Sequence, residues 1–232
     1  MKHIILVFFG FLLVSCSGAK MDQSTILNPN NETKNVRKDV LQNTSNGEDV
    51  KSSILTSKLK AYSTPENIED IMVYLTSDEL QGRDTGSEGI SKAADFIENV
   101  FKKNNIQPYF TSYRDTLTNY TDGTAFNVVG YLPGTDAKLK NEFVVIGAHY
   151  DHIGLMSGQV SDSIANGAND NASGTTTVLE FSKYFGELKG NKRSIIFALF
   201  SAEEKGLLGS KHLAGKLKDE NIDLYAMLNF EM

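Results

Sequence analysis

The sequence predicts an α/β fold: a mixed, largely parallel sheet flanked by helices. Three short apolar runs of strand length, 143–148, 195–200 and 225–230, support this prediction. Such runs are typical of strands that are buried on both faces of a sheet. Helical patterns occupy 175–188 and about 204–217, between these runs. Because strands that alternate with helices usually pair in parallel, we expect the three runs to share one sheet.

Two helices and one strand are predicted ahead of these runs. Thr64 and Pro65 are typical of a helix N-cap and first helical position, and apolar residues follow at helical spacing as far as Leu75. The run 125–132, which a Pro-Gly pair closes, predicts a strand. A second amphipathic helix is predicted from apolar residues at helical spacing: Ile90, Ala93, Ala94, Ile97, Val100 and Phe101.

The first 60 residues have a different character from the rest of the chain. Residues 1–15 combine a short basic start with an apolar run too short to span a bilayer, and they end before Cys16. This segment resembles a bacterial lipoprotein signal peptide, so we expect cleavage before Cys16 and lipidation of that residue; an ordinary signal peptide is the alternative. Residues 16–60 are polar and lack aromatic side chains, which predicts a flexible tether ahead of a domain at 61–232. We therefore expect an extracytoplasmic protein anchored to a bacterial membrane, in the periplasm or at the outer membrane.

Composition restricts the function only weakly. The chain has 232 residues, of which 40% are hydrophobic, enough for one sizeable core and about one or two domains. The formal net charge of −6 and a pI near 5.3 argue against nucleic acid as the main partner. Cys16 is the only cysteine, so no intrachain disulfide can form.

Metal-binding residue types recur in three motifs of the second half. His149 lies in GAHYDH, Asp170 in GANDNASG, and Glu203 with Glu204 in SAEEKG. Histidine nitrogens and carboxylate oxygens are the ligands that zinc accepts. We expect these segments at the carboxyl ends of the strands, where α/β sheets bind ligands. Taken singly, each motif also has a structural explanation, such as an Asx turn or acids at a helix start.

Together the motifs resemble peptidase family M28, the zinc exopeptidases of the bacterial aminopeptidase type. The resemblance covers about residue 64 to the C-terminus and includes GRDTGSEG at 82–89. It implies that His149 binds one metal ion and that Asp170 bridges two. It further implies that Glu204 binds the second ion, with Glu203 as general base. The resemblance also implies that Asp151 orients the imidazole of His149, and that the protein holds two zinc ions.

The chain departs from the family at its C-terminal end. Glu231 stands where the family commonly has Asp, a ligand of the same ion as His149. A last metal-binding histidine, farther downstream in the family, has no counterpart before Met232. We therefore expect these residues to be the N-terminal part of a longer protein, with little activity on their own.

The implied function is hydrolysis of terminal peptide bonds, most simply by an aminopeptidase acting on peptides. A carboxypeptidase or a glutaminyl cyclase of the same fold is an alternative, for which the exchange at Glu231 leaves room. A binding ectodomain without catalysis and a purely structural lipoprotein are further alternatives. His152 and His212 receive no role, and the sequence does not indicate an oligomeric state.

Overall fold

The computed structural model describes residues 63–158 and 162–232. The chain divides into two units, 1–58 and 59–232, and all described residues belong to the second. The predicted signal peptide, Cys16 and the predicted tether lie outside the described residues. Within the described ranges, no helix combines the length and the apolar character needed to cross a bilayer.

One mixed sheet forms the centre of the described unit. Its main path runs β1-β3-β5-β4-β6, with β2 paired to β3 beside this path. The strands are β1 (Gln107–Pro108), β2 (Arg114–Thr116), β3 (Phe126–Leu132), β4 (Glu142–His149), β5 (Ser194–Phe200) and β6 (Asp223–Asn229).

The strands that carry the candidate site are the parallel ones. β4 pairs in parallel with both β5 and β6, whereas β3 runs antiparallel to β5. The register sets His149, the last residue of β4, opposite Phe200, the last residue of β5. The carboxyl ends of β4, β5 and β6 therefore meet at one edge of the sheet. The predicted fold class, a mixed and largely parallel sheet flanked by helices, is confirmed.

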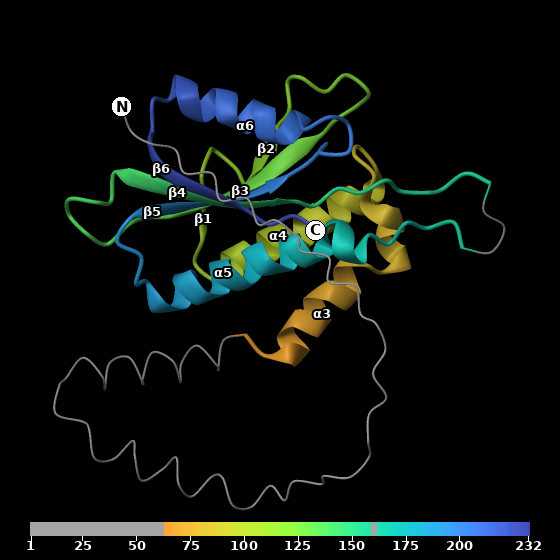
Figure 1. Ribbon diagram of the computed structural model, residues 1–232, viewed down its shortest axis with the longest axis horizontal. Coiled ribbons are helices and arrows are strands. Elements are labelled where there is room, and N and C mark those ends of the chain that lie inside the picture. Colours follow the sequence, from red (N-terminus) through yellow and green to blue (C-terminus); the bar gives the residue numbers. More distant parts are fainter. Residues whose placement is uncertain (1–62, 159–161) are drawn as a thin grey trace, which may run out of the picture. The chain divides into compact units, whose positions relative to one another are not determined.

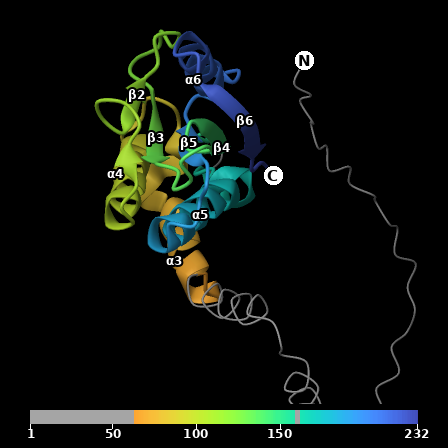
Figure 2. The same cartoon turned by 90° about the vertical axis from the view of Figure 1, so that its left-hand side faces the viewer.

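Helices cover both faces of the sheet (Figures 1 and 2). α4 (Glu88–Lys103) and α5 (Gly174–Leu188) lie on one face and pack against a large core that includes Phe101, Leu179 and Phe197. α6 (Leu208–Asp219) lies on the opposite face and contributes Leu213 and Leu217 to a smaller core. α3 (Pro65–Leu75) packs beside α5.

Local sequence signals explain where the first two helices begin. Thr64 caps α3, since its side chain accepts a hydrogen bond from the N–H of Asn67, and Pro65 is the first helical residue. Ser87 caps α4 in the same way, by accepting from the N–H of Ile90. Both predicted helices are confirmed.

The helix after the Glu pair begins later than the sequence pattern indicated. α6 starts at Leu208 rather than near Glu204, because Gly206 and Leu207 have positive φ angles of 99° and 63° that no helix accommodates. Glu203 and Glu204 therefore lie in the tight turn after β5, and they do not cap a helix.

β6 differs from the prediction in its burial. We expected all three apolar runs to be buried on both faces, but β6 is the edge strand and six of its seven residues are exposed. The exposed residues of β6 include four large apolar side chains: Leu224, Tyr225, Met227 and Leu228. By contrast, every residue of β5 is buried, because β5 lies between β3 and β4.

Candidate metal centre

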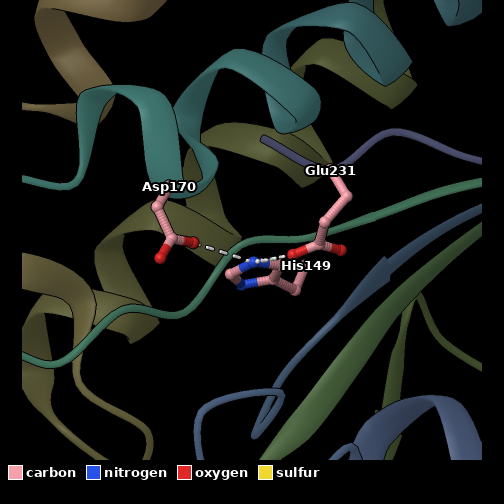
Figure 3. A group of neighbouring side chains, drawn as sticks. All are labelled: His149, Asp170 and Glu231. Carbon is pink, nitrogen blue, oxygen red and sulfur yellow. Dashed lines mark hydrogen bonds and ion pairs between the residues drawn. The ribbon is translucent and has the colours of Figure 1, made fainter. Parts of the chain in front are cut away.

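Three side chains from three segments converge at the carboxyl edge of the sheet (Figure 3). The Nε2 atom of His149 lies 3.0 Å from Oε1 of Glu231 and 3.1 Å from Oδ1 of Asp170. His149 ends β4, Glu231 follows β6, and Asp170 belongs to η2 (Ala168–Ser173), which leads directly into α5. The imidazole is buried, whereas the two carboxylates are about half exposed and approach it from either side.

The donor set of this first cluster fits zinc. One imidazole nitrogen and two carboxylate oxygens are ligand types of zinc sites, and the three ligand atoms lie within 4.8 Å of one another. Two ligands of one tetrahedral zinc ion, each about 2.1 Å from it, lie roughly 3.4 Å apart. The distances from Nε2 are slightly shorter than this, so small shifts would admit the ion.

A second cluster shares Asp170 with the first. The Nδ1 atom of His152 lies 2.8 Å from Oε1 of Glu204 and 3.8 Å from Oδ2 of Asp170. Asp170 therefore directs one carboxylate oxygen toward each histidine. His152 received no role from the sequence, although it follows the predicted ligand His149 by three residues. Its proximity to Glu204 depends on the turn after β5, which a sequence pattern does not define.

Asp151 holds the turn that carries the Glu pair. Its fully buried carboxylate accepts hydrogen bonds from the main-chain N–H groups of Glu203 at 3.1 Å and Glu204 at 3.3 Å. The Nδ1 atom of His149 lies nearer to the main-chain oxygen of Asp151, at 3.1 Å, than to its carboxylate, at 3.6 Å. The carboxylate thus lies beside the imidazole and fixes the Glu turn, and its part in orienting His149 stays a prediction.

The concentration of carboxylates perturbs the neighbouring titrating groups. Burial alone disfavours protonation of His149, but the side chains of Asp151 and Glu231 raise its pKa to about 9 in the metal-free protein. Burial raises the pKa of Glu203; the charge of His149 opposes this rise, and the negative charges of Glu231 and Glu204 add to it. A bound cation would relieve the repulsion among these carboxylates.

Asn171 and Thr175 support the first cluster, and neither was predicted from the sequence. The buried amide of Asn171 donates to the main-chain oxygen of Phe230 at 2.9 Å, directly before Glu231. The hydroxyl of Thr175 donates to the main-chain oxygen of His149, also at 2.9 Å. The position of Asn171 inside GANDNASG was the available signal, since an Asn in a turn commonly bonds to main-chain groups.

An apolar cavity of about 580 Å³ opens beside the cluster. His149, Glu203 and Glu231 line one part of it, and apolar side chains that include Val145, Leu213 and Met227 line the rest. The predicted general base and two predicted ligands thus face the same cavity.

The structure brings together all the predicted site residues that it describes. Cys16 lies outside the described residues. His212 belongs to neither ligand cluster. Its Nε2 atom lies 3.4 Å from Oδ1 of the buried Asp115. Lys216 reaches the same oxygen of Asp115 at 2.6 Å. His212 is therefore a packed residue of α6.

Comparison with protein families agrees with this arrangement. Residues 127–232 match the model of Peptidase family M28. Leucine aminopeptidase 1 of Paracoccidioides brasiliensis (strain Pb03) is 38% identical over 112 residues, which are 46% of this chain and 27% of that protein. Residues 127–232 are thus similar to part of an M28 peptidase domain, which confirms the resemblance. The chain aligns with little more than a quarter of this relative's length.

Solved structures show the same fold. The LapA aminopeptidase of Legionella pneumophila is 25% identical with a TM-score of 0.59, over 78% of this chain and 46% of that one. A Zn-dependent exopeptidase from Parabacteroides distasonis is 18% identical with a TM-score of 0.55, over 71% and 61%. Porphyromonas gingivalis glutaminyl cyclase is 16% identical with a TM-score of 0.57, over 73% and 61%. The described unit has the zinc exopeptidase fold.

Proposed function

We propose that the full-length protein is a zinc-dependent aminopeptidase with a dinuclear metal centre. The observation that carries this proposal is that the two ligand clusters share Asp170, while Glu203 lies beside them. Two metal ions that are about 3.5–4 Å apart need a shared carboxylate, which offsets the repulsion between their charges. The M28 match of residues 127–232 and the name of the aligned relative support the reaction class.

Each residue of the clusters has a distinct part in the proposal. His149, Asp170 and Glu231 would hold one zinc ion, and Asp170 and Glu204 would hold the second. Zinc in such a site polarises a carbonyl group and makes a nearby water more acidic. Glu203 takes a proton from the attacking water and passes it to the leaving amine. Its raised pKa suits the first of these transfers, because a stronger base takes a proton from water more readily.

His152 supplies the nitrogen ligand of the second ion in this proposal. It is a half-buried side chain whose Nδ1 faces both Glu204 and Asp170. Nitrogen together with two carboxylates repeats the composition of the first cluster. Replacing His152 by Ala should therefore remove about one zinc ion per chain and leave the ion at His149. A content of two ions in His152→Ala would exclude His152 as a ligand.

The substrate in this proposal is a peptide with a free N-terminus and an apolar first side chain. The cavity beside Glu203 and Glu231 supports this assignment, because its wall is mainly apolar and its polar end carries the carboxylates. A positively charged terminal amine would be attracted to those carboxylates. An apolar side chain would gain roughly 25 cal/mol for each Å² that it buries in the cavity.

The test compares leucine and lysine p-nitroanilides, with free and acetylated amino groups, as substrates of the full-length protein. We expect cleavage of leucine p-nitroanilide, with weak or no cleavage of the acetylated form. Glu203→Gln should lower kcat by about 10²- to 10⁴-fold while zinc content is retained. Glu88→Gln, an exposed acid in the first turn of α4, is the matched control. Full activity in Glu203→Gln would refute its role as the base.

Glutaminyl cyclase is the second candidate. The Porphyromonas gingivalis cyclase has the same fold, and Glu231 replaces the Asp that is common in the family. A cyclase would convert an N-terminal glutaminyl peptide to its pyroglutamyl form and would leave leucine p-nitroanilide intact. One zinc ion per chain together with that product would favour the cyclase. Cleavage of a peptide whose amino end is blocked, but not of one whose carboxyl end is blocked, would favour a carboxypeptidase.

We further propose that the protein is lipidated at Cys16 and anchored outside the cytoplasm. The support is the sequence of residues 1–15 and the position of Cys16 directly after it. Labelled palmitate should enter the wild-type protein and not Cys16→Ser. Equal labelling of both would contradict the anchor.

A further inference from the structure

We propose that the tripeptide Arg83-Asp84-Thr85 is a positioning element, which fixes the spacing of the segments that carry the metal ligands. This inference rests on the function proposed above. The tripeptide lies at the end of η1 (Asp78–Arg83), just before α4, and none of its side chains belongs to either ligand cluster. Yet each of the three contacts a different part of the site.

Arg83 connects the end of β4 to the loop that carries Asp170. Its side chain is only 1% exposed, which is unusual for an arginine. Its Nε donates to the main-chain oxygen of Tyr150 at 3.0 Å, directly after His149. Its terminal nitrogens donate to the main-chain oxygens of Asn166 at 2.8 Å and Gly167 at 2.9 Å, which precede Asp170.

The remaining contacts of Arg83 extend this connection. Its side chain donates to the main-chain oxygen of Leu75, at the end of α3. Its own main-chain oxygen accepts from the N–H of His152 at 3.1 Å. Burial lowers the pKa of the guanidinium to about 10, so it stays charged at neutral pH. Charged donors form the stronger hydrogen bonds, and only a guanidinium can reach so many acceptors at once.

Thr85 connects the tripeptide to the buried carboxylate of Asp151. Its hydroxyl donates to Oδ2 of Asp151 at 3.0 Å, and both side chains are buried. The same oxygen accepts the N–H of Glu204 at 3.3 Å. Thr85 therefore fixes the carboxylate that orders the Glu turn. The hydroxyl of Tyr120 in turn donates to the main-chain oxygen of Thr85 at 3.3 Å.

Asp84 makes the third and weakest connection. Its Oδ1 lies 2.8 Å from Nζ of Lys205, the residue after Glu204. Both side chains are around 40% exposed, so water screens the pair and it contributes little to the position of either residue. We assign most of the positioning to Arg83 and Thr85.

These contacts link the tripeptide to the ends of β4 and β5 and to the Asp170 loop. The distance between the two metal ions depends on the relative position of those segments, since the ligands come from each of them. Residues that hold metal ligands from outside the ligand set commonly change metal affinity or activity by about 10- to 100-fold when they are replaced. A role in core packing alone would instead lower stability and leave the metal affinity of the folded protein unchanged.

The experiment measures three quantities in the full-length protein. The first is zinc affinity, by competition with a chelator; the second is the visible absorption of the Co²⁺-substituted protein; the third is the melting temperature of the metal-free form. The variants are Arg83→Lys, which keeps the charge, and Thr85→Val, which keeps the shape. Arg114→Lys and Thr135→Val are the controls for the same exchanges, because these side chains donate to Glu98 and to the main-chain oxygen of Asn191 rather than to site segments.

We expect zinc affinity about 10- to 100-fold lower and an altered Co²⁺ spectrum in Arg83→Lys and Thr85→Val, with neither change in the controls. If Arg83→Lys does not fold, Thr85→Val alone decides. Wild-type affinity and an unchanged spectrum in Thr85→Val, whatever its melting temperature, would overturn the positioning role. Failure of the wild-type protein to bind zinc or Co²⁺ would instead refute the proposed function on which this inference rests.

Discussion

The main-chain N–H of Glu203 donates to Oδ1 of Asp151 at 3.1 Å, and both ends of that bond are fixed by the sheet. Asp151 follows the end of β4 by two residues, and Glu203 follows the end of β5 by three. Because β4 and β5 are parallel neighbours, the bond joins two adjacent strand ends. The carboxylate therefore couples the position of the general base proposed here to that of His149.

Replacing Asp151 by Asn tests this coupling. Both carboxylate oxygens of Asp151 accept hydrogen bonds from N–H or O–H groups. In Asn the side-chain NH2 would replace one of these oxygens and would face an N–H or O–H donor without an acceptor. We expect the free energy of unfolding to fall by about 1–3 kcal/mol, with a lower kcat. Urea denaturation of the metal-free protein and steady-state kinetics would measure both. Asp136→Asn, at a partly exposed carboxylate that accepts from two main-chain N–H groups, should leave kcat unchanged. An active, fully stable Asp151→Asn would exclude the coupling.

The metal-free protein should lose stability as the pH rises from about 6.5 to about 9. The pKa of His149 is raised from 6.5 to about 9 in the folded state, so folding favours the protonated form. This contribution is fully present below pH 6.5 and is lost as the pH passes the folded pKa. Urea denaturation at pH 6.5 and pH 9.5 would measure the loss. His149→Gln should remove the difference; an identical pH dependence in both proteins would contradict the assignment.

Zinc should stabilise the folded protein through Asp170. Free zinc at about 100 times its dissociation constant adds about 2.7 kcal/mol to the free energy of unfolding, if the unfolded chain does not bind it. We expect this gain in the wild-type protein and a much smaller one in Asp170→Asn, which weakens both clusters. Thermal melts with and without zinc would measure it. Equal stabilisation of the two proteins would place the ion elsewhere.

Gly174 should not tolerate an added methyl group, because main-chain and side-chain oxygens lie close to its Cα. A Cβ at this first residue of α5 would lie 2.4 Å from the main-chain oxygen of Phe230 and from Oδ1 of Asn171. We expect Gly174→Ala to displace the segment before Glu231 and to lower zinc affinity.

Gly186→Ala is the control for this substitution. Its Cβ would meet the main-chain oxygen of Asn104 at 2.1 Å, at the far end of the same helix. Both variants should therefore lower the melting temperature, but only Gly174→Ala should lower zinc affinity in a chelator competition. Equal zinc affinities in the two variants would show that the contact at Gly174 does not position Glu231.

The sequence predicted best those parts that local patterns determine. The apolar runs at β4 and β5 have strand length and no helical period, and both strands are confirmed. β1 and β2 were missed because two or three residues show no periodicity. The late start of α6 was missed because the turn imposes a positive φ on Leu207. Leucine does not favour a positive φ, so the sequence gives no sign of it.

The supporting residues of the site were harder to predict than its ligands. His149, Asp170, Glu204 and Glu231 are residue types that bind metal, so the motifs identify them as candidates. Arg83 looks like a solvent-exposed charge in a Gly-rich loop, and nothing local indicates that four main-chain oxygens surround it. His152 likewise becomes a candidate ligand only in the folded structure, where the turn after β5 places Glu204 beside it.

A zinc-edge anomalous difference map from crystals of the zinc-loaded, full-length protein tests the central claim most directly. We predict two peaks about 3.5–4 Å apart, on either side of Asp170. One should be bounded by His149 and Glu231, and the other by His152 and Glu204. A single peak, or no peak within bonding distance of Asp170, would contradict the account of a dinuclear metal centre.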